Sequence, residues 1–134
     1  MRSYDIATAS IAISSSRKWI DNVVSHYTIP GVTSRARGVE RGFSFEAIVL
    51  LDLTRVLVAE IGLPVRRAVD LAVHLRNSQG GEIALAGGVR LAIDLDTHTR
   101  RIQQRLLQAA ESVSRPRRGR PLRQSDRCET REAQ

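Results

Sequence analysis

Residues Ile11–His26 read IAISSSRKWIDNVVSH, and we expect the rest of the chain to be organised around this stretch. A short apolar segment runs into three serines, and the residues after the serines repeat with the helical period. Each serine is a candidate N-cap, because a hydroxyl at that position accepts a hydrogen bond from a first-turn amide. The polar arc of the helix holds Ser14, Arg17, Lys18, Asp21 and Ser25, and the opposite arc holds Ile20, Val23, Val24 and Tyr27.

A first short helix is expected over Ile6–Ala12 with Asp5 as its cap, and the second over about Ser15–Tyr27. Two short helices across a tight turn, the second with basic residues near its start, form the pattern of a helix-turn-helix. The second helix of that motif enters the DNA major groove. A solvated helix with a charged outer face fits the same residues. The candidate DNA contacts are Ser15, Ser16, Arg17, Lys18, Asp21 and Asn22.

An Arg-rich segment follows this helix. Ile29-Pro30-Gly31 ends the helix, because Pro and Gly continue a helix poorly. The next residues, Thr33–Gly42, read TSRARGVERG and lie between Val32 and Phe43, which predicts a small β-hairpin, or wing, with Gly38 at its turn. Such Arg groups pair with phosphates or enter the minor groove. A solvated loop is the alternative. The candidate contacts are Arg35, Arg37 and Arg41.

The next two segments predict the core helices. Phe45–Ile61 is apolar nearly all round, which is typical of a helix covered on several sides. Ser44 is its expected cap and Gly62 its end. Pro64 suits the start of a further helix that runs to about Leu75. Its expected outer residues are Arg66, Arg67, Asp70 and Arg76.

A hairpin and a last helix complete the ordered part. Glu82–Asp96 alternates polar and apolar residues on both sides of Gly87-Gly88, which predicts a β-hairpin with a two-residue turn. Its apolar face needs a partner, since an isolated hairpin is marginal in water. Thr97–Ser114 predicts the helix, with Asp96 or Thr97 as its cap.

This last helix carries a coiled-coil stripe. Its members, at spacings of four, three and four, are Ile102, Leu106, Ala109 and Val113. The stripe fits the hairpin of the same chain or a second copy. We favour the second copy because the central body already has a core, so the sequence predicts a homodimer.

The charge of the chain indicates a polyanionic partner. The 134 residues carry a net charge of +7, and Lys18 is the only lysine among 21 basic residues. Arg binds phosphate and guanine bidentately, although an Arg bias also fits a GC-rich genome. Residues 1–43 carry +3, residues 44–114 are neutral and residues 115–134 carry +4. The excess charge therefore lies at the two ends.

The C-terminal segment, Arg115–Gln134, has almost no apolar residues and predicts a disordered tail. It contains RPRRGRPL, in which Gly lets the backbone approach a groove floor while Arg extends along it. Insertion into an A·T-rich minor groove and general phosphate binding both fit this tail. The candidate contacts are Arg117, Arg118, Gly119 and Arg120.

The order of these motifs over Tyr4–Leu75 resembles the winged helix-turn-helix of the MerR and excisionase-like families. The resemblance is carried by ISSSRKWIDNVV, the RGF that ends the wing, the FSFEAI helix and IGLPVRRAVDL. It implies a sequence-specific, DNA-binding transcription regulator. MerR-type regulators have a longer dimer coil and often an effector domain; here the coil is short, and we expect no small-molecule ligand. The tail core Arg-Gly-Arg-Pro resembles an AT-hook.

Other function classes find little support in the sequence. Cys128 is the only cysteine, which excludes an internal disulfide and a zinc cluster. His26, His74 and His98 fall in three elements, where we expect surface or helix-end residues and no metal ligand. No catalytic motif is present, so we expect neither an enzyme nor a cofactor. No apolar run has membrane-spanning length and no signal core is present, which predicts a cytoplasmic, nucleoid-associated protein.

The sequence thus predicts a mainly α fold with small β elements. Residues 1–76 form a winged helix-turn-helix domain, residues 77–114 a β-hairpin with a dimerisation helix, and residues 115–134 a disordered basic tail. The expected partner is double-stranded DNA. Two alternatives remain: an architectural protein that binds DNA with little sequence choice, and an adaptor whose basic ends bind an acidic protein.

Overall fold

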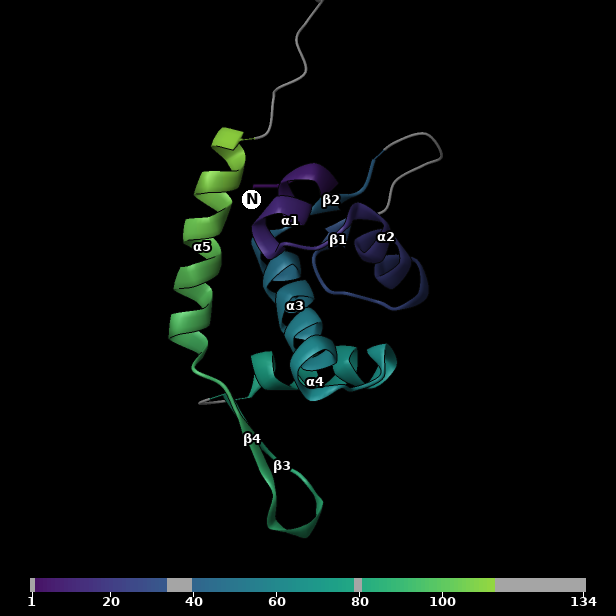
Figure 1. Cartoon of the computed structure of the whole chain (residues 1–134), viewed down its shortest axis with the longest axis vertical. Helices are drawn as coiled ribbons and strands as arrows, with labels where there is room; N and C mark the ends of the chain where they lie inside the picture. The colour runs from purple at the N-terminus through teal and green to yellow at the C-terminus, as the bar shows by residue number, and fades with distance from the viewer. Residues whose placement is uncertain (1, 34–39, 79–80, 113–134) are drawn as a thin grey trace, which may run out of the picture.

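The computed structural model describes residues 2–33, 40–78 and 81–112. The described chain is mainly helical with two small antiparallel sheets, which confirms the expected class at this level (Figure 1). The helices are α1 (Ile6–Ile13), α2 (Arg17–His26), α3 (Phe45–Val56), α4 (Val65–Asn77) and α5 (Leu95–Ser112). The strands are β1 (Val32–Thr33), β2 (Gly42–Phe43), β3 (Glu82–Ala84) and β4 (Arg90–Ala92).

Helix α3 forms the centre of the core. Ser44 caps it by accepting a hydrogen bond from the Ala47 amide at 3.1 Å, and every residue from 47 to 54 is buried. The helix continues as a π-helical turn, Leu57–Ile61, and ends at Gly62 with φ +80°. The expected central helix is therefore confirmed, and α4 packs against it.

The three serines after α1 form the turn to α2. The Asp5 carboxylate accepts from the Thr8 amide at 2.8 Å and caps α1, as expected. Ser14 takes the left-handed conformation, with φ 55° and ψ 47°. Ser16 accepts from the Trp19 amide at 3.0 Å, so it is the N-cap of α2. Helix α2 is shorter at both ends than the expected Ser15–Tyr27.

The first sheet pairs the two short strands around the Arg-rich segment. Val32 lies opposite Phe43, and Thr33 opposite Gly42, in antiparallel register. Tyr4 adds a bridge on the other side of β2, with N–O distances of 2.8 and 2.9 Å to Phe43. Sequence reasoning missed this N-terminal bridge, because a single paired residue leaves no periodicity. The expected turn residue Gly38 lies outside the described residues.

The second sheet is the expected hairpin, and it protrudes from the helical body (Figure 1). Ile83 pairs with Leu91, and Ile83 is buried. The expected two-residue turn is wrong: Ala86, Gly87 and Gly88 form one 3-10 turn. Both glycines have positive φ, 71° and 80°, which the longer turn requires.

Helix α5 packs chiefly on α1 and also contacts α3. Its stripe residues are buried within the single chain: Ile102 is 1 % exposed, Leu106 4 % and Ala109 0 %. The expectation that these three pack on a second copy is therefore wrong, because α1 offers small residues that allow close approach. Val113, the fourth member, lies outside the described residues.

The start of α5 also differs from expectation. The Asp94 carboxylate accepts hydrogen bonds from both the amide and the hydroxyl of Thr97, at 3.1 and 2.8 Å. The cap is thus Asp94, and neither Asp96 nor Thr97. This spacing of three residues between carboxylate and amide is that of an N-cap.

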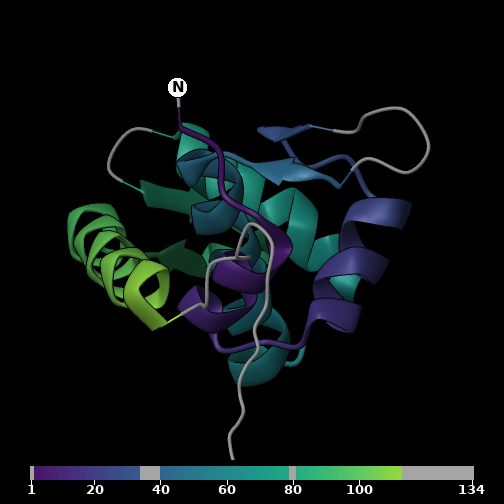
Figure 2. The ribbon, with the colours of Figure 1, turned by 90° about the horizontal axis from the view of Figure 1, so that it is seen from above.

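The described elements share one hydrophobic core. Residues from α1, α2, α3, α4, β3 and α5 belong to the same buried cluster. The boundary drawn after residue 76 therefore does not separate two cores. In Figures 1 and 2, α5 and α2 lie on opposite sides of α1.

Candidate nucleic-acid interface

Helix α2 has one buried and one exposed face. Ile20 is 0 % exposed and Val23 is 3 % exposed, and they attach the helix to the core. The side chains of the opposite face are exposed: Arg17, Lys18, Asp21, Asn22 and Ser25. The division predicted from the helical period is confirmed for all of these residues except Asn22, which that prediction did not assign to either side. Arg17 and Lys18 thus lie exposed in the first turn of α2, while Ile20 and Val23 attach the other side of the helix to the core.

The two turn serines among the candidate contacts have structural roles. The Ser15 carbonyl accepts from the Ser10 hydroxyl at 2.6 Å, and the Ser15 amide donates to the Ser10 carbonyl at 3.1 Å. The Ser16 hydroxyl oxygen accepts from Trp19 and is exposed. Its O–H remains chemically able to donate to a phosphate oxygen.

An ion pair links the start of β2 to α2. Arg41, immediately before β2, pairs through Nη1 with the Asp21 carboxylate and donates through Nη2 to the Ser25 hydroxyl at 3.2 Å. The side chains of Arg41 and Asp21 are 31 % and 56 % exposed. Both residues are candidate DNA contacts, and the structure brings them together. The pair neutralises Asp21, so Arg17 and Lys18 set the charge of this face.

The remaining basic candidates for DNA contact lie outside the part of the chain that the structure describes. Arg35 and Arg37 lie outside the described residues. The same holds for the tail candidates Arg117, Arg118, Gly119 and Arg120. The described part of the candidate interface is therefore α2, the serine turn before it and Arg41.

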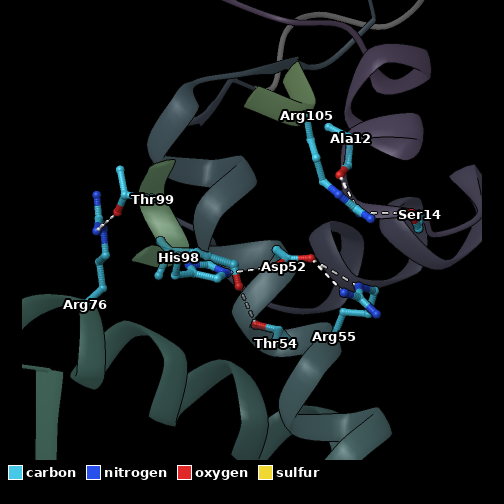
Figure 3. A network of polar contacts seen from close by, with 10 residues as sticks. Ala12, Ser14, Asp52, Thr54, Arg55, Arg76, His98, Thr99 and Arg105 are labelled. Atoms are coloured by element: carbon cyan, nitrogen blue, oxygen red, sulfur yellow. Dashed lines mark hydrogen bonds and ion pairs between the residues drawn. The ribbon is translucent and has the colours of Figure 1, made fainter. Parts of the chain in front are cut away.

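A buried polar cluster lies between α3 and α5 (Figure 3). His98 Nε2 donates to Asp52 Oδ2 at 2.7 Å, and Arg55 donates to Asp52 Oδ1 at 3.2 and 3.0 Å. The side chains of His98 and Asp52 are 14 % and 7 % exposed. His98 lies in the first turn of α5, a helix-end position as expected, but its side chain is largely buried and does not lie on the surface. Among the described residues, its Nδ1 is buried without a hydrogen-bond partner.

The surroundings of Asp52 perturb its ionisation. Burial raises the pKa of the carboxyl, because it disfavours the charged form. Hydrogen bonds from His98 and Arg55, together with their charges, lower the pKa and outweigh burial. The pKa of Asp52 lies below its ordinary value, so the carboxylate is charged at neutral pH and accepts the hydrogen bond from His98 Nε2.

Two further Arg residues join α5 to the rest of the chain (Figure 3). Arg76 of α4 donates to both oxygens of Glu46, at 2.9 and 3.0 Å, and to the Thr99 hydroxyl at 3.1 Å. The sequence predicted that Arg76 lies on the outer face of its helix, but its side chain is only 20 % exposed. Arg105 of α5 donates to the Ala12 carbonyl at 3.2 Å and to Ser14 Oγ at 3.0 Å. Sequence reasoning missed Arg105, since its partners lie more than 90 residues away.

Two kinds of site, metal clusters and membrane spans, are not found in the described ranges. No three His, Cys, Asp or Glu side chains there gather as metal ligands. None of the helices in the described chain combines the length and apolarity that a membrane span requires. Comparison with known proteins adds no relative: no family model, no curated protein and no solved structure matches this chain.

Proposed function

We propose that this protein binds double-stranded DNA through a winged helix-turn-helix and regulates transcription at specific sites. The observation that carries the proposal is the two-faced α2. It follows α1 across a three-serine turn, its apolar side is buried, and Arg17 and Lys18 are exposed in its first turn. The N-terminal residues of a recognition helix are those that contact base edges.

The chemistry of these side chains suits the major groove. An α-helix fits its width, and Arg or Lys there donates to the O6 and N7 acceptors of guanine. Asn22 lies on the same exposed face and carries the amide that pairs with adenine. Asp21 is the one acid on that face, and its pairing with Arg41 reduces repulsion of phosphates.

The paired strands β1 and β2 support a wing. They bring Thr33 and Gly42 opposite one another, so the Arg-rich residues 34–39 connect two antiparallel strands. Arg41 ties the base of this hairpin to α2. A wing attached in this way would follow the DNA backbone beside the groove that α2 enters. The net charge of +7 agrees with such a partner.

The experiment is a binding assay with the full chain. Duplexes selected by the protein from a random library are compared with random duplexes at two salt concentrations. A specific regulator retains a preferred site at higher salt, whereas an architectural protein shows a steep salt slope without preference. An adaptor binds no duplex at either salt concentration, which would refute the proposal.

Variants then test the assigned face. Arg17→Ala should weaken binding to the selected duplex by roughly 1–3 kcal/mol if Arg17 reads a base. Lys18→Ala should weaken it as well. Arg101→Ala is the matched control, because Arg101 is also exposed but lies on α5, across α1 from α2. Unchanged affinity of both α2 variants, with intact folds, would remove α2 from the interface.

A further inference from the structure

The guanidinium of Arg105 lies at the end of α1, where the chain turns toward α2 (Figure 3). Its Nη1 donates to the Ala12 carbonyl at 3.2 Å and to the Ser14 hydroxyl at 3.0 Å. The last carbonyls of a helix lack partners within the helix and carry partial negative charge. Arg105 of α5 therefore donates to one of the last carbonyls of α1, and the same nitrogen contacts the turn.

Ser14 has the least favourable backbone conformation of this turn. Among the described residues it is the one non-glycine with a positive φ, 55°. An L-residue with a Cβ adopts this conformation at a cost, and glycine is the usual occupant. Serine has what glycine lacks, a hydroxyl, and that hydroxyl accepts from Arg105. The contact thus stabilises a backbone conformation that serine disfavours.

The conformation of the turn sets the direction in which α2 leaves it. Only three residues, Ser14 to Ser16, separate α1 from Arg17. The Ser10–Ser15 hydrogen bonds and the Ser16 cap hold the rest of the turn. Helix α2 itself has just two fully buried residues, Ile20 and Val23. Ser14 lies three residues before Arg17, so a change of its backbone conformation acts on the start of α2, whereas Ile20 and Val23 hold the middle of the helix.

We infer that Arg105 is a positioning residue for α2. Arg105 acts from α5 through its contact with Ser14, and this inference rests on the proposed function of α2 in binding DNA. The helix that carries Arg105 lies across α1 from α2 (Figures 1 and 2). Arg105 thereby couples the placement of α5 to the placement of Arg17 and Lys18. Its role is to fix the geometry of the DNA-facing side chains, and a phosphate contact is not part of that role.

The chain contains a built-in probe of this geometry. Trp19 is its only tryptophan, and it lies in the first turn of α2 with its amide bonded to Ser16. Acrylamide quenching of Trp19 fluorescence therefore reports on the start of α2. Arg105→Met keeps an unbranched apolar stem and removes the donors, and it should increase quenching. Arg76→Met is the matched control, because it releases a different tie to α5 and should leave quenching at the parent value.

DNA binding gives the second measurement. The probes are a duplex selected by the parent protein and a random G·C-rich duplex. Arg105→Met should lower the preference for the selected duplex by about five- to tenfold, whereas Arg76→Met should keep it. The salt slope should stay that of the parent. A slope smaller by about one would identify a lost phosphate contact and overturn the positioning role.

A second variant protects the test against misfolding. Ser14→Ala removes the hydroxyl at an exposed position and keeps the Cβ that disfavours the positive φ, so it should fold and should also increase Trp19 quenching. If neither Arg105→Met nor Ser14→Ala changes quenching, the inference is wrong. If the parent binds no duplex, the proposed function fails, and the quenching comparison alone still decides whether Arg105 positions α2.

Discussion

Replacement of Asp52 by alanine tests whether the buried cluster holds α5 on α3. Asp52 is 7 % exposed and accepts hydrogen bonds from His98 and Arg55. Asp52→Ala removes both acceptors and leaves His98, itself 14 % exposed, without its partner. Loss of one member of a buried pair costs about 3–5 kcal/mol. Arg55 is 28 % exposed and can turn toward water, so we expect the lower end of this range.

A loss of about 3 kcal/mol is a large part of the 5–15 kcal/mol that stabilises a typical domain. For a chain of this size it should lower Tm by about 10 °C. The assay is thermal unfolding followed by far-ultraviolet circular dichroism at pH 7, with urea unfolding to obtain the free energy. The matched control is Glu82→Ala, which breaks an exposed pair with Arg90 and should cost at most about 1 kcal/mol.

The melting temperatures of the two variants test whether the buried cluster holds α5 in place. If Asp52→Ala melts no lower than Glu82→Ala, the buried cluster contributes nothing to the docking of α5. The shared hydrophobic stripe would then be sufficient to hold this helix.

The same cluster predicts how stability depends on pH. The pKa of Asp52 is lowered from its ordinary value of 3.8, since the hydrogen bonds from His98 and Arg55 outweigh burial. A depressed folded-state pKa contributes stability that is present above the unfolded value and is lost as pH falls through the folded value. Asp52→Asn should therefore lose less stability than the parent between pH 7 and pH 3. Equal losses, measured by urea midpoints, would contradict this assignment.

Four further outcomes are expected. Leu106→Ala should cost about 2–5 kcal/mol in urea unfolding, because it opens a cavity under α5. Ser44→Ala should cost about 1 kcal/mol, since α3 loses its cap. The homodimer stays a prediction: light scattering should show a dimer, and Leu107→Glu, at a position 68 % exposed, should dissociate it without unfolding if α5 is the interface. The double variant Arg118→Lys, Arg120→Lys should reduce the preference for A·T-flanked over G·C-flanked sites; an unchanged ratio would make the tail a polycation.

The sequence alone determined what depends on neighbours three or four residues apart. Asp5 and Ser44 cap their helices by accepting from the third following amide, as the sequence predicted, whereas the structure selects Ser16 from the three candidate serines before α2. The helical period likewise predicted which side of α2 is buried, because only an amphipathic arc can attach a short helix to a core. These local rules produced the basic face that the proposed function uses.

Tertiary structure alone decided which distant polar groups meet and which partner an apolar stripe takes. Asp21 and Arg41 are 20 residues apart, Asp52 and His98 are 46 apart, and Ser14 and Arg105 are 91 apart. The sequence analysis predicted none of these pairs, because no spacing rule relates residues that are so far apart in the chain. The stripe of α5 has coiled-coil spacing whether it covers α1 or a second copy, since apolar attraction has no direction of its own. Only the path of the chain in space brings a particular acceptor to a particular donor.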